Sequence, residues 1–112
     1  MSHLVINTFR MGPGISSNQF ANFSARVDQP TLLAHSDLVK RFNVHQVQHP
    51  TEGSPLGVDI VEIMEVSDWS RWVEVRDQHP SLKPVISGFD DLVDLDSVRS
   101  SFVVPVLRGS QA

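Results

Sequence analysis

The sequence predicts an α+β fold in which helices cover one face of a four-stranded antiparallel sheet. Three segments alternate their side chains between two faces with the period of two that is typical of strands, namely residues 3–11, 39–48 and 58–66, and residues 100–108 are expected to form a fourth strand. Two other segments, 16–27 and 69–92, repeat apolar side chains every three or four residues, as amphipathic helices do. The resulting order, β-α-β-β-α-β, is that of the ferredoxin-like fold.

The first helical segment begins after the serine pair at 16–17, either member of which can cap a helix. Phe20 and Phe23 lie on one stripe of this helix. We expect residues 28–30, Asp-Gln-Pro, to end it, because proline cannot continue a regular helix. Residues 31–37 are then expected to form a second short helical turn.

The second helical region begins at Trp69, where Ser67 or Asp68 can act as the cap. Pro80 and Pro84 predict a kink or a break before the apolar stripe resumes. We therefore expect two helical pieces between the third and fourth strands.

Length and composition narrow the classes of protein to consider. The chain has 112 residues, the size of one domain spanning residues 1–112. Its formal net charge of −4, without a basic stripe, argues against a nucleic-acid partner. No apolar run approaches the roughly 20 residues that span a bilayer, so we expect no membrane contact and a cytoplasmic location. Residues 49–57 form a loop rich in Pro and Gly, long for a hairpin and therefore a candidate functional loop.

The two faces of the predicted sheet differ in character. The uniformly apolar face, expected to pack against the helices, consists of Leu4, Ile6, Phe42, Val44, Val61 and Ile63. The opposite face is mixed, and its expected members are Val5, Asn7, Phe9, Asn43, His45, Val47, Ile60, Glu62 and Met64. This mixture suits a wet cavity or a subunit interface, because polar groups there need placed partners. Since such a patch is unusual on a monomer, we expect a homodimer.

Three polar residues of the mixed face are the candidate catalytic residues. Histidine can exchange a proton near neutrality, which makes His45 a candidate acid or base. Glu62, on the same expected face, is its candidate partner, since a half-apolar cavity raises the pKa of a carboxyl group. Asn7 can orient a carbonyl or hydroxyl group of a ligand. Structural roles stay open for all three, including an ion pair between Glu62 and Arg41 across a dimer interface.

Aromatic and imidazole side chains are the candidate contacts for a small aromatic substrate. The residues proposed for this role are Trp72, His79, His35, Phe9 and Met64. Trp72 offers a flat surface for stacking, although an aromatic stripe that includes Trp69 is equally typical of a core. His79 and His35 are also consistent with solvent-facing positions at helix and strand ends.

The sequence predicts no metal site and no cofactor. His45 and His49 are four residues apart, and in a strand this spacing separates them by about 13 Å, too far for one zinc ion. There is no HExxH, EF-hand, GxGxxG or nucleophile-elbow motif, and there is no cysteine. Any chemistry is therefore expected to use cavity shape and proton transfer.

Two stretches carry a resemblance to known families. Residues 58–68 (VDIVEIMEVSD) form an aliphatic strand with an embedded Glu that runs into a helix cap, and residues 76–82 (RDQHPSL) precede 89–93 (FDDLV). Over nearly the whole chain, this layout resembles the dimeric α+β barrel superfamily. The first stretch, with residues 44–47 and the 53–55 loop upstream, resembles the REDY-like (HapK) family of small bacterial secondary-metabolism proteins.

The family resemblance implies a cofactor-free cyclase of natural-product biosynthesis that acts on indole-derived intermediates and forms carbazole rings. Relatives are expected to place the pocket between the sheet and the helices, which would favour the candidates Trp72, His79 and His35 over Glu62. The alternative, a cavity inside the shared barrel, favours Glu62 and His45.

The superfamily also contains cofactor-free quinone-forming monooxygenases and haem-degrading monooxygenases, which use an Asn on the first strand and a Trp on the second helix. Asn7 and Trp72 resemble that pair. The axial His of haem degraders would fall near Leu82 and is missing there, which argues against haem. Three functions stay open: a cyclase, a cofactor-free monooxygenase on a polyphenol, and a non-catalytic dimeric binding protein.

Overall fold

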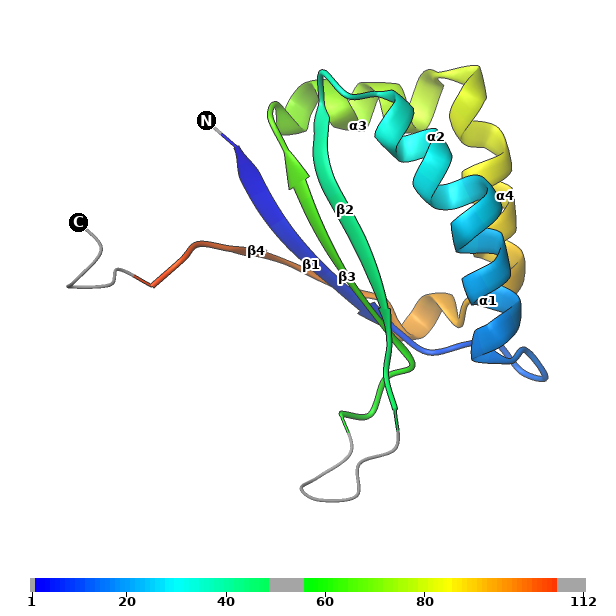
Figure 1. The fold of residues 1–112 in the computed structure, drawn as a ribbon. Helices are drawn as coiled ribbons and strands as arrows, with labels where there is room; N and C mark the ends of the chain where they lie inside the picture. Colours follow the sequence, from blue (N-terminus) through cyan, green and yellow to red (C-terminus); the bar gives the residue numbers. More distant parts are fainter. Residues whose placement is uncertain (1, 49–55, 107–112) are drawn as a thin grey trace.

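The computed structural model describes residues 2–48 and 56–106, which form a four-stranded antiparallel sheet with helices on one side (Figure 1). The strands are β1 (His3–Phe9), β2 (Val39–Gln46), β3 (Ile60–Val66) and β4 (Arg99–Val103). Their order across the sheet is β2-β3-β1-β4. The α-helices are α1 (Ser17–Phe23), α2 (Gln29–Ala34), α3 (Trp69–Gln78) and α4 (Lys83–Leu92). The predicted α+β, ferredoxin-like arrangement is confirmed.

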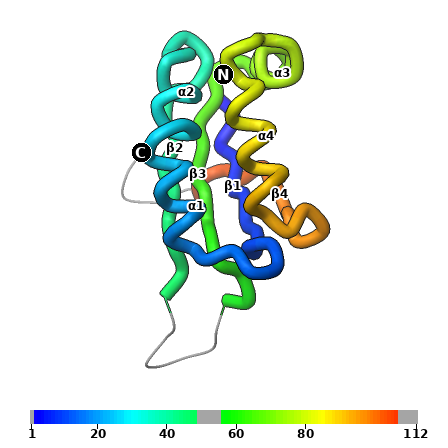
Figure 2. The backbone as a smooth tube through the Cα atoms, turned by 90° about the vertical axis from the view of Figure 1, so that its right-hand side faces the viewer, coloured from blue at the N-terminus to red at the C-terminus, as the bar shows by residue number. Residues whose placement is uncertain are grey.

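The helices form a single layer over the sheet (Figure 2). The run containing α1 and α2 lies beside α4, while α3 crosses one end of the layer. Gly88 of α4 allows the close approach of these two helical runs, because a Cβ atom there would overlap the ring of Phe23. No helix among the described residues is long and apolar enough to cross a membrane.

The first helical run is continuous, so the helix end predicted at residues 28–30 is wrong. Between α1 and α2 lies the π-helix η1 (Ser24–Asp28), in which the Gln29 N–H donates to the carbonyl of Ser24. Pro30 follows at once. In an α-helix its ring would clash with the carbonyl four residues earlier, and its missing N–H would leave a gap. The wider π-helical turn accommodates it.

The second helical region has the predicted break. Asp68 caps α3, with its side chain accepting a hydrogen bond from the N–H of Arg71 over 3.1 Å. The helix ends before His79, and the 3₁₀-helix η2 (Pro80–Leu82) connects it to α4. The predicted cap and the predicted break near Pro80 are therefore both confirmed.

All four strands are shorter than the sequence predicts. β1 stops at Phe9, beyond which Met11 makes an isolated bridge with Val93. β4 ends at Val103, and the last two residues of the strand expected at 100–108 lie outside the described residues. Most of the candidate loop at 49–57 also lies outside them.

The sheet face that meets the helices was predicted wrongly for β1 and β3. The side chains buried on this inner face are Val5, Phe9, Phe42, Ile60, Glu62, Met64 and Val66. Leu4, Ile6, Val61 and Ile63, expected toward the helices, lie on the open face instead. The assignment for β2, with Phe42 and Val44 inward, is correct. Both faces of β1 and β3 are apolar enough for burial, so alternation alone does not choose between them.

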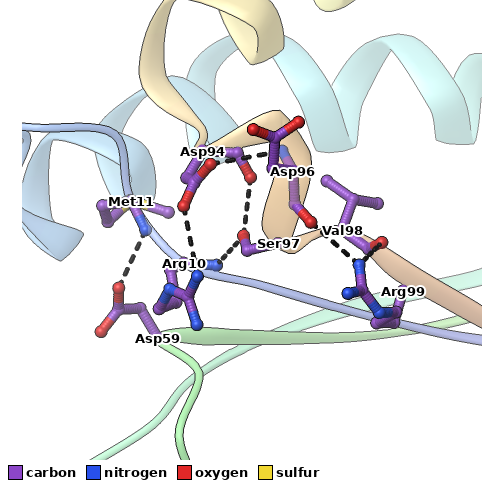
Figure 3. A network of polar contacts seen from close by, with 8 residues as sticks. All are labelled: Arg10, Met11, Asp59, Asp94, Asp96, Ser97, Val98 and Arg99. Atoms are coloured by element: carbon purple, nitrogen blue, oxygen red, sulfur yellow. Dashed lines mark hydrogen bonds and ion pairs between the residues drawn. The ribbon is translucent and has the colours of Figure 1, made fainter.

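A polar network at the start of β4 fixes this strand against β1 (Figure 3). The hydroxyl of Ser97 donates to the carbonyl of Asp94 over 2.6 Å and accepts from the N–H of Arg10 over 2.8 Å. The N–H of Asp94 in turn donates to the Arg10 carbonyl over 2.9 Å. β4 therefore pairs with β1 in a register that sets Ser100 opposite Asn7.

Candidate active site

A pocket of about 390 Å³ lies between the inner face of the sheet and the helices. The sheet contributes the lining residues Val5, Asn7, Phe42, Glu62, Met64 and Ser100. The helices contribute Asp28, Leu32, Trp69, Trp72, Arg76, Leu82, Val85, Ile86, Phe89 and Asp90. The volume falls within the range of small-molecule sites, and an apolar lining with a few polar groups is typical of them.

Glu62 is the polar centre of the sheet wall. Its side chain is only 5% exposed, and Asn7, its direct cross-strand neighbour on β1, donates from Nδ2 to Oε1 over 3.3 Å. Ser100, on the next strand, donates from Oγ to Asn7 Oδ1 over 2.6 Å. This bond orients the Asn7 amide so that its NH₂ group faces Glu62. Three neighbouring strands thus hold one carboxyl group in place.

Burial determines the charge of Glu62. Removal from water raises the pKa of its carboxyl from an ordinary value of 4.5 to about 8; the charge of Asp28 adds to this, and the hydrogen bond from Asn7 opposes it. Glu62 is therefore mostly a neutral carboxylic acid at pH 7. A neutral acid at the wall of an apolar pocket can donate a proton to a ligand oxygen.

Asp28 is a second buried carboxyl in the pocket, and the sequence interpretation missed it. It lies in η1 and is 4% exposed. Ser24 Oγ donates to Asp28 Oδ2 over 3.3 Å, and Gln29 Nε2 donates to Ser24 Oγ over 3.1 Å. Burial raises the pKa of Asp28 to about 6, while the bond from Ser24 lowers it. The sequence signal that could have found it is the spacing. Asp28 follows Phe20 by eight residues and Ser24 by four, which favours one side of the helical run, and the structure buries all three.

Aromatic side chains form much of the remaining wall. Trp72 is 3% exposed, and Trp69 stands edge-to-face with Phe102 of β4 at a ring distance of 4.9 Å. Both tryptophans line the pocket with Phe42 and Phe89. These rings give the pocket flat apolar surfaces against which a ligand can pack.

His45 does not lie near Glu62, so the expectation that they share a face is wrong. In the β2–β3 register Val44 is opposite Glu62, whereas His45 is opposite Val61 and is exposed on the open face. Alternation along a strand thus separates the two side chains across the sheet. Arg41 lies opposite Glu65 on the open face and cannot pair with the buried Glu62.

The candidate substrate-binding residues divide into two groups. Met64 and Trp72 line the pocket. Phe9 is fully buried in a neighbouring cluster, edge-to-face with Phe20 and Phe89. His35 and His79 do not line the pocket.

The two histidines instead form a contact at the ends of α2 and α3. Their rings stand 4.9 Å apart, and His35 Nε2 lies 3.0 Å from Ser81 Oγ. His79 Nδ1 accepts a hydrogen bond from the Ser81 N–H over 3.1 Å. This arrangement ties the two helix ends together. Across residues 2–48 and 56–106, no group of three or more His, Cys, Asp or Glu side chains could hold a metal ion.

Fold and pocket together define a small ferredoxin-like α+β protein with an acid-lined cavity beneath its helices. The family model of REDY-like protein HapK matches residues 3–104, and the chain belongs to this family. HapK from Hahella chejuensis has a similar structure, with a TM-score of 0.73, 17% sequence identity, and coverage of 100% of this chain and 99% of HapK. The predicted family resemblance is confirmed.

More distant structures share the fold. A hydroxynitrile lyase from Passiflora edulis has a TM-score of 0.64 at 14% identity, covering 96% of this chain and 97% of the lyase. A dimeric ferredoxin-like protein of unknown function from Thermobifida fusca has a TM-score of 0.65 at 11% identity, covering 94% of this chain and 92% of that protein. No curated protein is significantly similar to this chain in sequence.

The substitution Glu62→Gln tests the burial of this carboxyl. Between its ordinary pKa of 4.5 and the folded value of about 8, the native state keeps a proton that the unfolded state releases. The free energy of unfolding of the wild type should therefore fall as pH rises through this range. Asp28, whose pKa is raised only to about 6, contributes to this decrease only at the lower pH values. Glu62→Gln should flatten the fall by a few kcal/mol, since one pKa unit is worth about 1.4 kcal/mol.

Urea denaturation at a series of pH values measures this effect. The matched control is Glu74→Gln, because Glu74 is exposed on α3 and should leave the slope unchanged. Equal slopes for the wild type and Glu62→Gln would contradict the assignment of a buried, neutral Glu62.

Proposed function

We propose that this protein is a cofactor-free cyclase of natural-product biosynthesis that acts on a reactive indole-type or carbazole-type intermediate. The observation that carries the proposal is Glu62, a buried and mostly neutral acid facing a ligand-sized cavity with aromatic walls. Ring closure by loss of water needs a proton for the departing oxygen, and Glu62 is placed to supply it.

The pocket supports this chemistry through shape as well as acidity. A substrate held between Trp69, Trp72 and Phe42 has few orientations available, so its reacting atoms are kept close together. Exclusion of water limits side reactions of an unstable intermediate. Asn7 is close enough to Glu62 to bind the same carbonyl or hydroxyl group. The fold is compatible with an enzyme, since a hydroxynitrile lyase shares it.

A second candidate function is a cofactor-free monooxygenase acting on a polyphenol. One observation favours it: Asn7 and Trp72, which resemble the residue pair of such enzymes, line the same pocket. The two reactions differ in product mass, because cyclisation by dehydration loses one water whereas oxygenation adds oxygen.

We also propose that the chain forms a homodimer through the open face of its sheet. Leu4, Ile6, Val61 and Ile63 are only half-buried there. The helices of the described residues lie on the other side of the sheet (Figure 1). Two such faces packed together would remove this apolar surface from water. The similar protein from Thermobifida fusca is described as dimeric.

Sedimentation equilibrium tests the dimer. We expect twice the 12.5 kDa of one chain for the wild type, and a shift toward the monomer for Ile63→Lys, which sets a charge in the interface. Ser87→Lys, on the exposed surface of α4, is the control. A wild type that sediments as a monomer at all concentrations would contradict the proposal.

Incubation with indole-derived hydroxyketones, followed by mass spectrometry of the products, tests the catalytic proposal. We expect products lighter by one water with the wild type and with Glu74→Gln. Glu62→Gln should be slower by about 100-fold or more, because it removes the general acid. Products that gain oxygen would contradict the cyclase and support the monooxygenase. Binding of the same compounds without turnover would leave a binding protein.

A further inference from the structure

The pocket contains a second buried carboxyl, that of Asp28 in the helical layer, which the dehydration described so far does not use. Glu62 rises from β3 of the sheet, whereas Asp28 descends from η1 of the helical layer. Both side chains are at most 5% exposed, and both line the same cavity. A ligand in the pocket is therefore within reach of one carboxyl group from the sheet and one from the helical layer.

The π-helix is what points Asp28 inward. Phe20, Ser24, Asp28 and Leu32 are all buried, at intervals of four residues. In a regular α-helix of 3.6 residues per turn, this spacing drifts around the axis, and three steps would carry the last residue well away from the first. The wider turn of η1 offsets part of this rotation, so the four side chains stay on the same side of the helical run. Such π-helical turns are often found at functional sites.

The two carboxyls sit in different polar environments. Asp28 accepts a hydrogen bond from the Ser24 hydroxyl, which is itself held by Gln29. Glu62 accepts from the Asn7 amide, and this is the only hydrogen bond that the described residues give its carboxyl. Of the remaining pocket-lining groups, Arg76 of α3 and Asp90 of α4 are charged, and Arg76 is paired with Asp77 at 2.9 Å. β1, β2 and β4 contribute only uncharged side chains.

These environments divide the pair into a base and an acid. The pKa of Asp28 is raised to about 6 and that of Glu62 to about 8, so near pH 7 Asp28 is mostly ionised and Glu62 mostly neutral. The charge on Asp28 helps to keep the proton on Glu62. Because the two groups interact, the two titration steps belong to the pair.

We propose that Asp28 is the general base and Glu62 the general acid of a two-carboxyl pair, and that the pair dehydrates the ring-closed form of the substrate, which carries a hydroxyl on the carbon next to an acidic C–H. The proposal rests on the proposed function and extends it by a second catalytic residue and a substrate class. Dehydration of this form creates the last double bond of an aromatic ring.

The reaction balances without an oxidant. The Asp28 carboxylate removes the proton from carbon, and the C–H electron pair becomes the new C=C bond. The neighbouring C–O bond breaks with its electron pair, and the leaving oxygen takes the proton of Glu62 and departs as water. Asp28 is then protonated and Glu62 ionised. Transfer of one proton from Asp28 to Glu62, directly or through water, restores the starting state.

The base can be tested apart from dehydration, with 2-indanone as the probe. This flat ring ketone has acidic C–H groups and no leaving hydroxyl. In heavy water, proton removal by Asp28, assisted by Glu62 at the carbonyl oxygen, exchanges these hydrogens for deuterium, and proton NMR follows the loss of signal. We expect exchange faster than in buffer, with a rate that rises with pH near 6 and falls near 8.

Two variants and a control decide the role of Asp28. Asp28→Asn should lower the exchange rate by about 100-fold, whereas Asp91→Asn, exposed on α4 outside the pocket lining, should not change it. Ser24→Ala keeps the base but removes the hydrogen bond that lowers the pKa of Asp28. The increase of the exchange rate with pH should therefore occur at a higher pH than in the wild type. Ser24→Ala keeps the test valid if Asp28→Asn fails to fold.

The outcomes separate this proposal from the proposed function. The role of Asp28 would be overturned if Asp28→Asn exchanged deuterium as fast as the wild type. It would also be overturned if the rate in Ser24→Ala rose at the same pH as in the wild type. Either result would hold even if Glu62-dependent dehydration is found. No exchange above buffer with the wild type would also overturn it. Exchange that depends on Asp28, with no dehydration of any hydroxyketone, would support the pair and contradict the cyclase.

Discussion

The burial of one carboxyl group, Glu62, is the constraint on which the rest of the site depends. A carboxyl in an apolar cavity is costly when ionised, so it must either be paired or stay neutral. Here it stays neutral, because it is buried, its hydrogen-bonding partner is the uncharged amide of Asn7, and the like charge of Asp28 disfavours its ionisation. The order of strands brings its partners together: β3 lies beside β1, and β1 beside β4, so Ser100 holds Asn7 and Asn7 holds Glu62.

The helical layer depends on a second local constraint, the proline at position 30. A regular helix would have to end before it, leaving no continuous wall over the sheet. The π-helical turn lets the chain continue to Ala34 and turns Asp28 into the cavity. Ser24 then partners the buried carboxyl. A single backbone irregularity thus gives the pocket part of its helical cover and its second buried carboxyl.

The order of elements, the Asp68 cap and the family were predictable from the sequence, because each depends on local patterns that tertiary packing did not override. The orientation of β1 and β3 was not. Apolar side chains such as Ile6 and Ile63 suit a core as well as Val5 and Met64 do, and the polar residues Asn7 and Glu62 were therefore assigned outward. They lie inward, where both line the pocket and bond to each other, although polar side chains usually face water. His45 was paired with Glu62 by the same error, and Asp28 was missed because residues 28–30 were interpreted as a helix end.

The protonation state of Glu62 at neutral pH is the central claim, and a titration of its carboxyl carbon tests it most directly. Protein labelled with carbon-13 glutamate would be followed by NMR across pH, with Glu62→Gln identifying the signal. We expect a midpoint near 8, well above the ordinary value of 4.5. A midpoint near 4.5 would mean that Glu62 is ionised in the pocket, and it would contradict the assignment of this residue as the proton donor.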